Sequence, residues 1–138
     1  MNDHPAIKPA YYLACFHCEA PLEDLPRVFG IVTACNPFGR ILSSDENRQR
    51  DRDLEQQLIS MGHPFFRISG GSRDGKHLEP GFGLWTLDAK ALRELGQDWE
   101  QDAVFWITDG IVSMIACQEG SFHEVGSLAE RWVDRRPD

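Results

Sequence analysis

Long hydrophobic runs are missing from this chain of 138 residues. The two longest strongly apolar stretches, Ala103–Ile107 and Ile111–Cys117, are far shorter than the roughly 20 residues that cross a bilayer. The N-terminal stretch Met1–Pro9 carries acid, histidine and proline instead of a basic region followed by an apolar one, unlike a signal peptide. We therefore expect a cytoplasmic protein with no membrane partner.

Positive charge is also scarce. Lys and Arg number 14 against 22 Asp and Glu, which gives a formal net charge of −8. A surface of this sign repels phosphate backbones, so nucleic acid is not expected as a partner. The acids are scattered among Lys and Arg, and we therefore interpret the charge as serving solubility rather than imitating a nucleic acid.

Cysteine is limited to four residues, Cys15, Cys18, Cys35 and Cys117. In a reducing cytosol we expect no structural disulfide among them. Cys15 and Cys18 form a single C-x-x-C, but no second pair or two closely spaced histidines follow to complete a zinc site. Pro21 and Pro26 oppose the helix that a redox C-x-x-C would begin. We interpret the pair as inert thiols, with zinc and redox chemistry as the alternatives, and expect no cofactor.

Motifs of known catalytic sites are a further absence. The sequence contains no P-loop, no dinucleotide-binding fingerprint, no G-x-S-x-G and no H-E-x-x-H. Asp74-Gly75 lacks the dense carboxylate spacing of a calcium loop. Whether the protein is an enzyme is therefore left open, and we favour a role without catalysis and without a metal.

The hydrophobic pattern predicts five strands and two long helices. The strands are expected at 29–35, 65–69, 81–87, 103–107 and 111–117, and the helices at 43–61 and 88–99. Ser43 and Glu46 form a capping box, and Asp109-Gly110 is typical of a two-residue hairpin turn. Leu128 and Trp132 predict a short helix within 126–135.

This order predicts a single α+β domain over residues 1–138. Residues 1–26 form a lead-in segment with a short strand at 10–16. The following β-α-β-β-α-β order is the split β-α-β, or ferredoxin-like, pattern, in which right-handed crossovers place two helices on one face of an antiparallel sheet. The strand at 111–117 is an extra C-terminal hairpin strand that pairs with 103–107.

Polar residues from distant segments are expected at one end of this sheet. Asn36 ends the first strand, Glu46 and Asn47 open the first helix, and Gln101 and Asp102 precede the fourth strand. In the predicted topology these positions lie beside the loop 70–80, and loop ends on a rigid scaffold commonly handle ligands.

The first helix gives a second indication of the same place. Its apolar stripe at Leu54 and Leu58 continues toward the N-terminus as polar residues, among them Arg50 and Asn47. If this half of the helix is packed, its polar groups need protein partners or a ligand. The alternative is a solvated helix end, since charged first turns are common.

Several short motifs follow one another along the chain. They are Thr33-Ala-Cys-Asn-Pro37, Ser44-Asp-Glu-Asn47, Gly70, Asp74-Gly75, Glu79-Pro80 and Glu100-Gln-Asp-Ala-Val-Phe105. In this order and spacing they resemble the bacterial family called domain of unknown function 3293 (DUF3293), over residues 29–117. The resemblance implies a bacterial protein but no particular activity. Its motif positions are Asn36, Glu46, Asn47, Gly70, Glu79, Gln101 and Asp102. Cys35 stands where relatives commonly carry an aromatic residue, so stacking is not required there.

The leading hypothesis is a non-enzymatic binding module for a small polar molecule or a partner protein. The candidate ligand-binding residues are Asn36, Glu46, Asn47, Arg50, Arg73 and Gln101. Their amides would orient a ligand, because amides donate and accept hydrogen bonds but are poor acids and bases. An arginine, Arg50 or Arg73, would meet an anionic group of the ligand.

Two other classes remain open. A small hydrolase or transferase would use His77 or Glu79, which share one side of an extended chain, as general base, with a divalent ion near Asp102. An interaction protein would instead form a homodimer through the strand 111–117 at the edge of the sheet. The enzyme would need these two groups within hydrogen-bonding reach of each other across a concave pocket, with at least one carboxylate of perturbed pKa. Size in solution would test the dimer.

Overall fold

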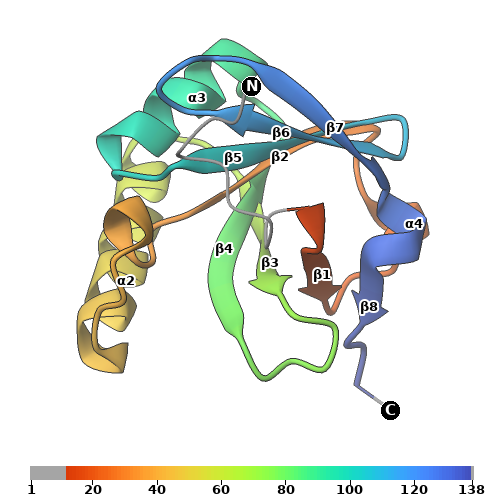
Figure 1. The fold of residues 1–138 in the computed structure, drawn as a ribbon, viewed down its shortest axis with the longest axis horizontal. Coiled ribbons are helices and arrows are strands. Elements are labelled where there is room, and N and C mark those ends of the chain that lie inside the picture. The colour runs from red at the N-terminus through yellow and green to blue at the C-terminus, as the bar shows by residue number, and fades with distance from the viewer. Residues whose placement is uncertain (1–11, 138) are drawn as a thin grey trace, which may run out of the picture.

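Eight strands pair into one sheet in the computed structural model, which describes residues 12–137 (Figure 1). They are β1 (Cys15–Cys18), β2 (Val28–Thr33), β3 (Phe65–Gly71), β4 (Leu78–Leu84), β5 (Ala103–Thr108), β6 (Ile111–Ala116), β7 (Phe122–Ser127) and β8 (Trp132–Asp134). The spatial order is β7-β6-β5-β2-β4-β3-β1-β8. Neighbouring strands are antiparallel, except that β1 and β8 are parallel.

Three α-helices accompany the sheet among the described residues: α2 (Ser44–Ser60), α3 (Ala89–Asp98) and the single turn α4 (Leu128–Arg131). Two short 3-10 turns are η1 (Leu22–Asp24) and η2 (Pro37–Gly39). The predicted capping box is confirmed, because the Glu46 N–H donates to Ser43 Oγ at 3.1 Å and the Ser43 N–H donates to the Glu46 carboxylate at 3.2 Å.

The sheet is curled rather than flat. Figure 1 shows β2, β5 and β6 lying across the top of the view, while β4, β3, β1 and β8 run steeply downward from them. The mixed α+β class predicted from the sequence is confirmed. The observed sheet is larger than the predicted one, because β7 and β8 join it and the N-terminal strand β1 pairs between β3 and β8.

Apolar side chains form two core clusters on opposite faces of the sheet. The first contains Leu54 and Leu58 of α2 and Leu92 of α3, packed against the sheet. Adjacent residues of β2 divide between the clusters, since Val32 belongs to the first and Ile31 to the second. The second cluster therefore lines the face that α2 and α3 do not cover.

Both ends of the chain differ from the prediction. The short helix expected within 126–135 is present but is limited to the single turn Leu128–Arg131, and the flanking residues form β7 and β8. Strand pairing gives these flanks backbone partners that one helical turn cannot provide. The N-terminal strand begins at Cys15, and the part of the predicted strand at residues 10 and 11 lies outside the described residues.

The strand predicted at 111–117 does not lie at the edge of the sheet. It is observed as β6 and pairs with β5, as expected, but β7 pairs with its other side, with Met114 opposite His123. Its backbone is therefore already paired on both sides, and the predicted place of this strand at the edge of the sheet is wrong. None of the described helices has the length and apolar character that crossing a membrane requires.

Candidate functional site

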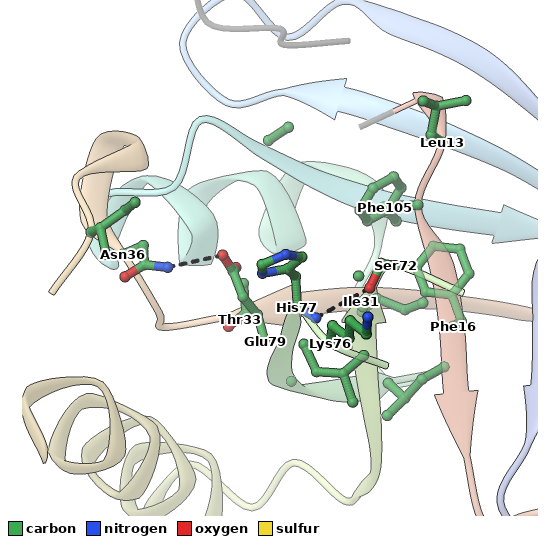
Figure 2. A pocket seen from close by; sticks show the side chains of 18 of the residues that line it. Leu13, Phe16, Ile31, Thr33, Asn36, Ser72, Lys76, His77, Glu79 and Phe105 are labelled. Atoms are coloured by element: carbon green, nitrogen blue, oxygen red, sulfur yellow. Dashed lines mark hydrogen bonds between the residues drawn. The ribbon is translucent and has the colours of Figure 1, made fainter. Parts of the chain in front are cut away.

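A cavity of about 770 Å³ lies on the sheet face opposite α2 and α3 (Figure 2). Its apolar wall includes Phe16 of β1, Ile31 of β2, Ile68 of β3 and Phe105 of β5. The Phe16 and Phe105 rings meet edge to face with their centroids 5.1 Å apart. A volume of this size is within the range of small-molecule sites.

Gly70 of β3 leaves part of this volume open. A Cβ atom placed there would meet only the Phe16 ring, at an ordinary contact distance of 3.8 Å. Ile68, two residues earlier on the same strand, also lines the cavity, so the missing Gly70 side chain would point into the same space. The glycine therefore contributes to the size of the cavity rather than to a backbone strain.

Polar side chains form a second part of the wall. They are Thr33, Asn36, Ser44, Ser72, Lys76, His77 and Glu79. Figure 2 shows most of them around the cavity, with the Asn36 amide donating to the Glu79 carboxylate at 3.1 Å. His77 and Glu79, the candidate acid and base, thus line one cavity, whereas Asp102 does not belong to its wall.

The turn between β3 and β4 is held by its own hydrogen bonds. The Ser72 N–H donates to the His77 carbonyl at 2.9 Å, and the His77 N–H donates to Ser72 Oγ at 3.1 Å. The Lys76 N–H donates to Asp74 Oδ1 at 3.0 Å, and this bond, with a second from the Ser72 hydroxyl, lowers the pKa of the Asp74 carboxyl. Lys76 and His77 are therefore carried by an ordered hairpin tip at 72–77, shorter than the predicted loop 70–80.

A buried histidine ties this tip to β1. His17 is 4% exposed, and its Nε2 lies 2.8 Å from the Ser72 carbonyl oxygen. Arg135 donates from Nε to His17 Nδ1 at 3.0 Å, and since arginine only donates, Nε2 is the protonated nitrogen that donates to Ser72. The neutral ring thus links the hairpin tip to β1 and to the segment after β8.

Sequence reasoning missed His17, Phe16 and Lys76. The signal for His17 is present as one histidine inside the short run Cys15-Phe-His-Cys18, which is buried along its whole length. The contributions of Phe16 and Lys76 depend on β1 lying beside β3, a pairing between segments more than fifty residues apart. No local pattern in the chain indicates that pairing.

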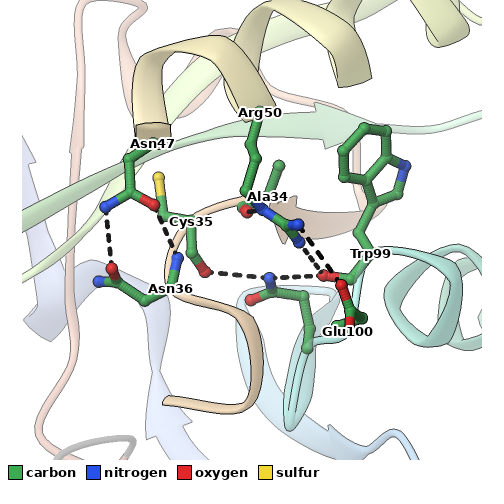
Figure 3. Close-up of polar contacts among 8 residues, drawn as sticks. Ala34, Cys35, Asn36, Asn47, Arg50, Trp99 and Glu100 are labelled. Carbon is green, nitrogen blue, oxygen red and sulfur yellow. Dashed lines mark hydrogen bonds and ion pairs between the residues drawn. The ribbon is translucent and has the colours of Figure 1, made fainter. Parts of the chain in front are cut away.

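The predicted polar residues gather beside the cavity, where most of their polar groups bond within the chain (Figure 3). Asn36 and Asn47 pair reciprocally, with the Asn36 N–H donating to Asn47 Oδ1 at 2.9 Å and Asn47 Nδ2 donating to Asn36 Oδ1 at 2.8 Å. Asn36 Oδ1 also accepts from the Leu42 N–H at 3.0 Å. The two side chains thereby hold the β2–α2 connection against the first turns of α2.

Arg50 and Gln101 bond mainly to backbone carbonyls. The Arg50 guanidinium donates to the Ala34 carbonyl at 2.6 Å and to the Trp99 carbonyl at 2.7 Å, and it lies 3.4 Å from the Glu100 carboxylate. Gln101, which is 6% exposed, donates to the Cys35 carbonyl at 3.0 Å. The polar half of the α2 stripe is therefore packed and bonded to protein groups. This agrees with the expectation of protein partners and not with a solvated helix end.

The remaining candidates are dispersed. Glu46 serves the capping box, and Arg73 donates to the Glu130 carbonyl in α4 instead of joining the amides. Asn36 and Glu79 also line a second hollow of about 250 Å³ that is bordered by Asn47 and Asp51 on α2. The Asn36–Glu79 pair therefore lies between the large cavity and this smaller one.

All four cysteines are free and buried. Burial raises the pKa of the Cys18 and Cys35 thiols, and it raises that of Cys117 to about 12. Cys15 and Cys18 lie three apart on β1, so they point to opposite faces of the sheet. Within residues 12–137 no group of three or more His, Cys, Asp or Glu is arranged to hold a metal, near Asp102 or elsewhere.

Comparison with known proteins gives one result. No curated protein and no solved structure matches the chain. The model of a family described as "Protein of unknown function (DUF3293)" matches residues 32–104, more than half of the chain, from the end of β2 to the start of β5. This segment contains the hairpin tip and the polar cluster around Asn36. The chain therefore belongs to the DUF3293 family.

Proposed function

We propose that this protein is a non-enzymatic binding module that holds one small molecule in the 770 Å³ cavity. The observation that carries the proposal is the cavity itself, with aromatic and aliphatic side chains on one part of its wall and a group of polar side chains on the other. Such a wall suits a molecule with an apolar body and a polar end. This differs from the small polar ligand expected from the amide residues.

The amides support the site without being its main contacts. Asn47 accepts the backbone N–H of Asn36, and Gln101 donates to the backbone carbonyl of Cys35. Asn36 in turn holds Glu79 at the cavity wall. We infer that the split β-α-β arrangement of β2–β5 with α2 and α3 persists within the larger sheet, and that β1 completes the cavity against it. One chain supplies the wall, so binding needs no homodimer.

An acid–base enzyme is the second candidate, because His77 and Glu79 line the same cavity. Both would lie beside the polar end of a bound molecule, where a general base has to act. The two candidates separate in one assay, in which a bound compound is followed by mass spectrometry. Recovery of the intact compound after long incubation supports the binding module, and its conversion by wild type but not by His77→Ala or Glu79→Gln supports the enzyme.

The binding proposal is tested by a thermal-shift screen of small amphipathic molecules with three proteins. Gly70→Leu puts a branched side chain into the cavity beside Phe16, whereas Gly70→Ala leaves most of the volume open. We expect hits that raise the Tm of wild type and Gly70→Ala but not that of Gly70→Leu. Ala103→Leu, which fills the wall from β5, is the second blocking variant should Gly70→Leu fail to fold.

Two outcomes contradict the proposal. In the first, no compound in the screen raises the Tm of wild type. In the second, both blocking variants fold with their own cooperative transitions and still respond to the hits as wild type does, which places the binding elsewhere.

A further inference from the structure

We infer that the cavity selects a small monocarboxylate, whose carboxylate is bound by Lys76 while its apolar body lies against Phe16 and Phe105. The inference rests on the proposed function and adds the charge and class of the ligand to it. Three observations carry it: an unpaired cation, an engaged anion and an ordered loop.

Lys76 is the unpaired cation. Its side chain lines the cavity, and its ammonium group has no ion pair or hydrogen bond within the described part of the chain. Arg50 and Arg67, by contrast, have carboxylate partners. An ammonium group beside an apolar cavity attracts an anionic group that arrives together with an apolar body.

Glu79 is the engaged anion of the cavity wall. Its carboxylate accepts the Asn36 amide at 3.1 Å, on the side that also borders the smaller hollow. A ligand amine would have to share this carboxylate with the Asn36 amide. The Lys76 ammonium group and the His77 ring have no hydrogen-bond partner among residues 12–137, so the donors still available in this wall favour an acceptor on the ligand.

The hairpin tip presents Lys76 in an ordered frame. Five hydrogen bonds join residues within the segment 72–77, and the buried His17 ring holds Ser72 from β1. A frame that is already ordered loses little conformational entropy when the ligand binds. Lys76 therefore needs only to order its own side chain around the carboxylate.

The charge balance favours one carboxylate over a phosphate group. Lys76 and Glu79 are the two groups of fixed opposite charge in the wall, and the chain as a whole carries a formal charge of −8. A phosphate monoester brings close to two negative charges, which one exposed lysine beside a glutamate does not balance. A single negative charge matches the single unpaired cation.

The test compares three probes of nearly equal shape that differ in charge: 4-phenylbutanoate, 4-phenylbutan-1-ol and 4-phenylbutan-1-amine. We expect wild type to bind the carboxylate about fivefold more tightly than the alcohol, and the amine most weakly, by isothermal titration at low ionic strength. The preference for the carboxylate should shrink as salt is raised, because the pair is partly exposed.

Lys76→Met keeps the apolar stem and removes the charge, and Lys90→Met makes the same change at an exposed position of α3, away from the cavity. We expect Lys76→Met to bind the carboxylate no better than the alcohol and to leave the affinity for the alcohol unchanged, while Lys90→Met behaves as wild type. Equal affinities for carboxylate and alcohol in wild type, or tightest binding of the amine, overturn the inference but leave the proposed function standing. Failure of all three probes to bind also overturns the inference, and the thermal-shift screen then decides the proposed function separately.

Discussion

At the scale of single residues, the polar side chains that looked like ligand contacts hold the protein together. Asn36 has a left-handed backbone, with φ of 48°, at which a side chain that bonds locally is an advantage. Its partner Asn47 reaches it from α2, eleven residues later. The gathering of these residues could be predicted from topology, but their mutual hydrogen bonds could not, because these depend on side-chain geometry within one ångström.

Replacement of Asn47 by alanine should therefore reduce stability. The change leaves the half-buried Asn36 N–H without its acceptor and removes a donor from Asn36 Oδ1, which should lower the free energy of unfolding by about 1–3 kcal/mol. Gln49→Ala, on the exposed side of the same helix, is the control and should change it by less than about 0.5 kcal/mol. Urea unfolding measures both, and equal effects of the two variants would contradict the structural role of Asn47.

Cys117 predicts a specific loss of stability at alkaline pH. Its pKa is raised from 9.0 to about 12 in the folded protein, chiefly by burial. Between these two values the unfolded thiol ionises while the folded one stays protonated, so the free energy of unfolding falls by about 1.4 kcal/mol per pH unit. Cys117→Ala should have a shallower decline from pH 8 to pH 11 in urea unfolding, and parallel curves for the two proteins would exclude the effect.

At the scale of elements, local sequence signals predicted helices and turns correctly, whereas the pairing of strands distant in the sequence could not be predicted. The capping box at Ser43, the Asp109-Gly110 turn and the helices around Leu54 and Leu92 could be predicted, because their causes lie within a few residues. β1 and β8 are parallel neighbours from the two ends of the chain. The free energy of that pairing depends on the packing of the whole molecule, so no short motif in the sequence predicts it.

The hairpin tip at 72–77 depends on its anchor in β1. His17→Ala removes the donor to the Ser72 carbonyl and the acceptor of Arg135, and we expect the amides of Ser72 and Gly75 to exchange hydrogen at least about tenfold faster. Amides in the centre of β5 should be affected only by the global loss of stability. Hydrogen exchange followed by NMR makes the comparison, and uniform acceleration over the chain would argue against a local anchor.

Packing of α3 on β2 depends on the absence of a side chain at Gly30. A Cβ there would lie 2.3 Å from Leu92 Cδ2, so Gly30→Ala should destabilise the fold by about 1–3 kcal/mol. Gly70→Ala, whose new Cβ has ordinary contacts, is the matched control and should be nearly neutral. The double variant Gly30→Ala, Leu92→Ala should lose less stability than the sum of the losses of the two single variants. Strict additivity in thermal unfolding would contradict the contact.

At the scale of the whole molecule, curling of the sheet separates two tasks. One face packs against α2 and α3 and supplies the first core cluster, and the other bends around the cavity. Extra strands at both edges extend the core, and β1 brings Phe16 and the anchored hairpin to the cavity. The cavity wall forms only when the strands are assembled into the sheet. The sequence therefore predicts the polar residues at its rim but not its apolar interior.

The most direct test of this account is a ¹H–¹⁵N NMR titration of the labelled protein with 4-phenylbutanoate. The account predicts the largest shift changes at Ile31, Ile68, Gly70, Ser72 and Lys76, which line the cavity from β2, β3 and the hairpin tip. Largest changes instead at Asn47, Arg48 and Asp51, around the smaller hollow on α2, would contradict it, as would a spectrum that does not change at all.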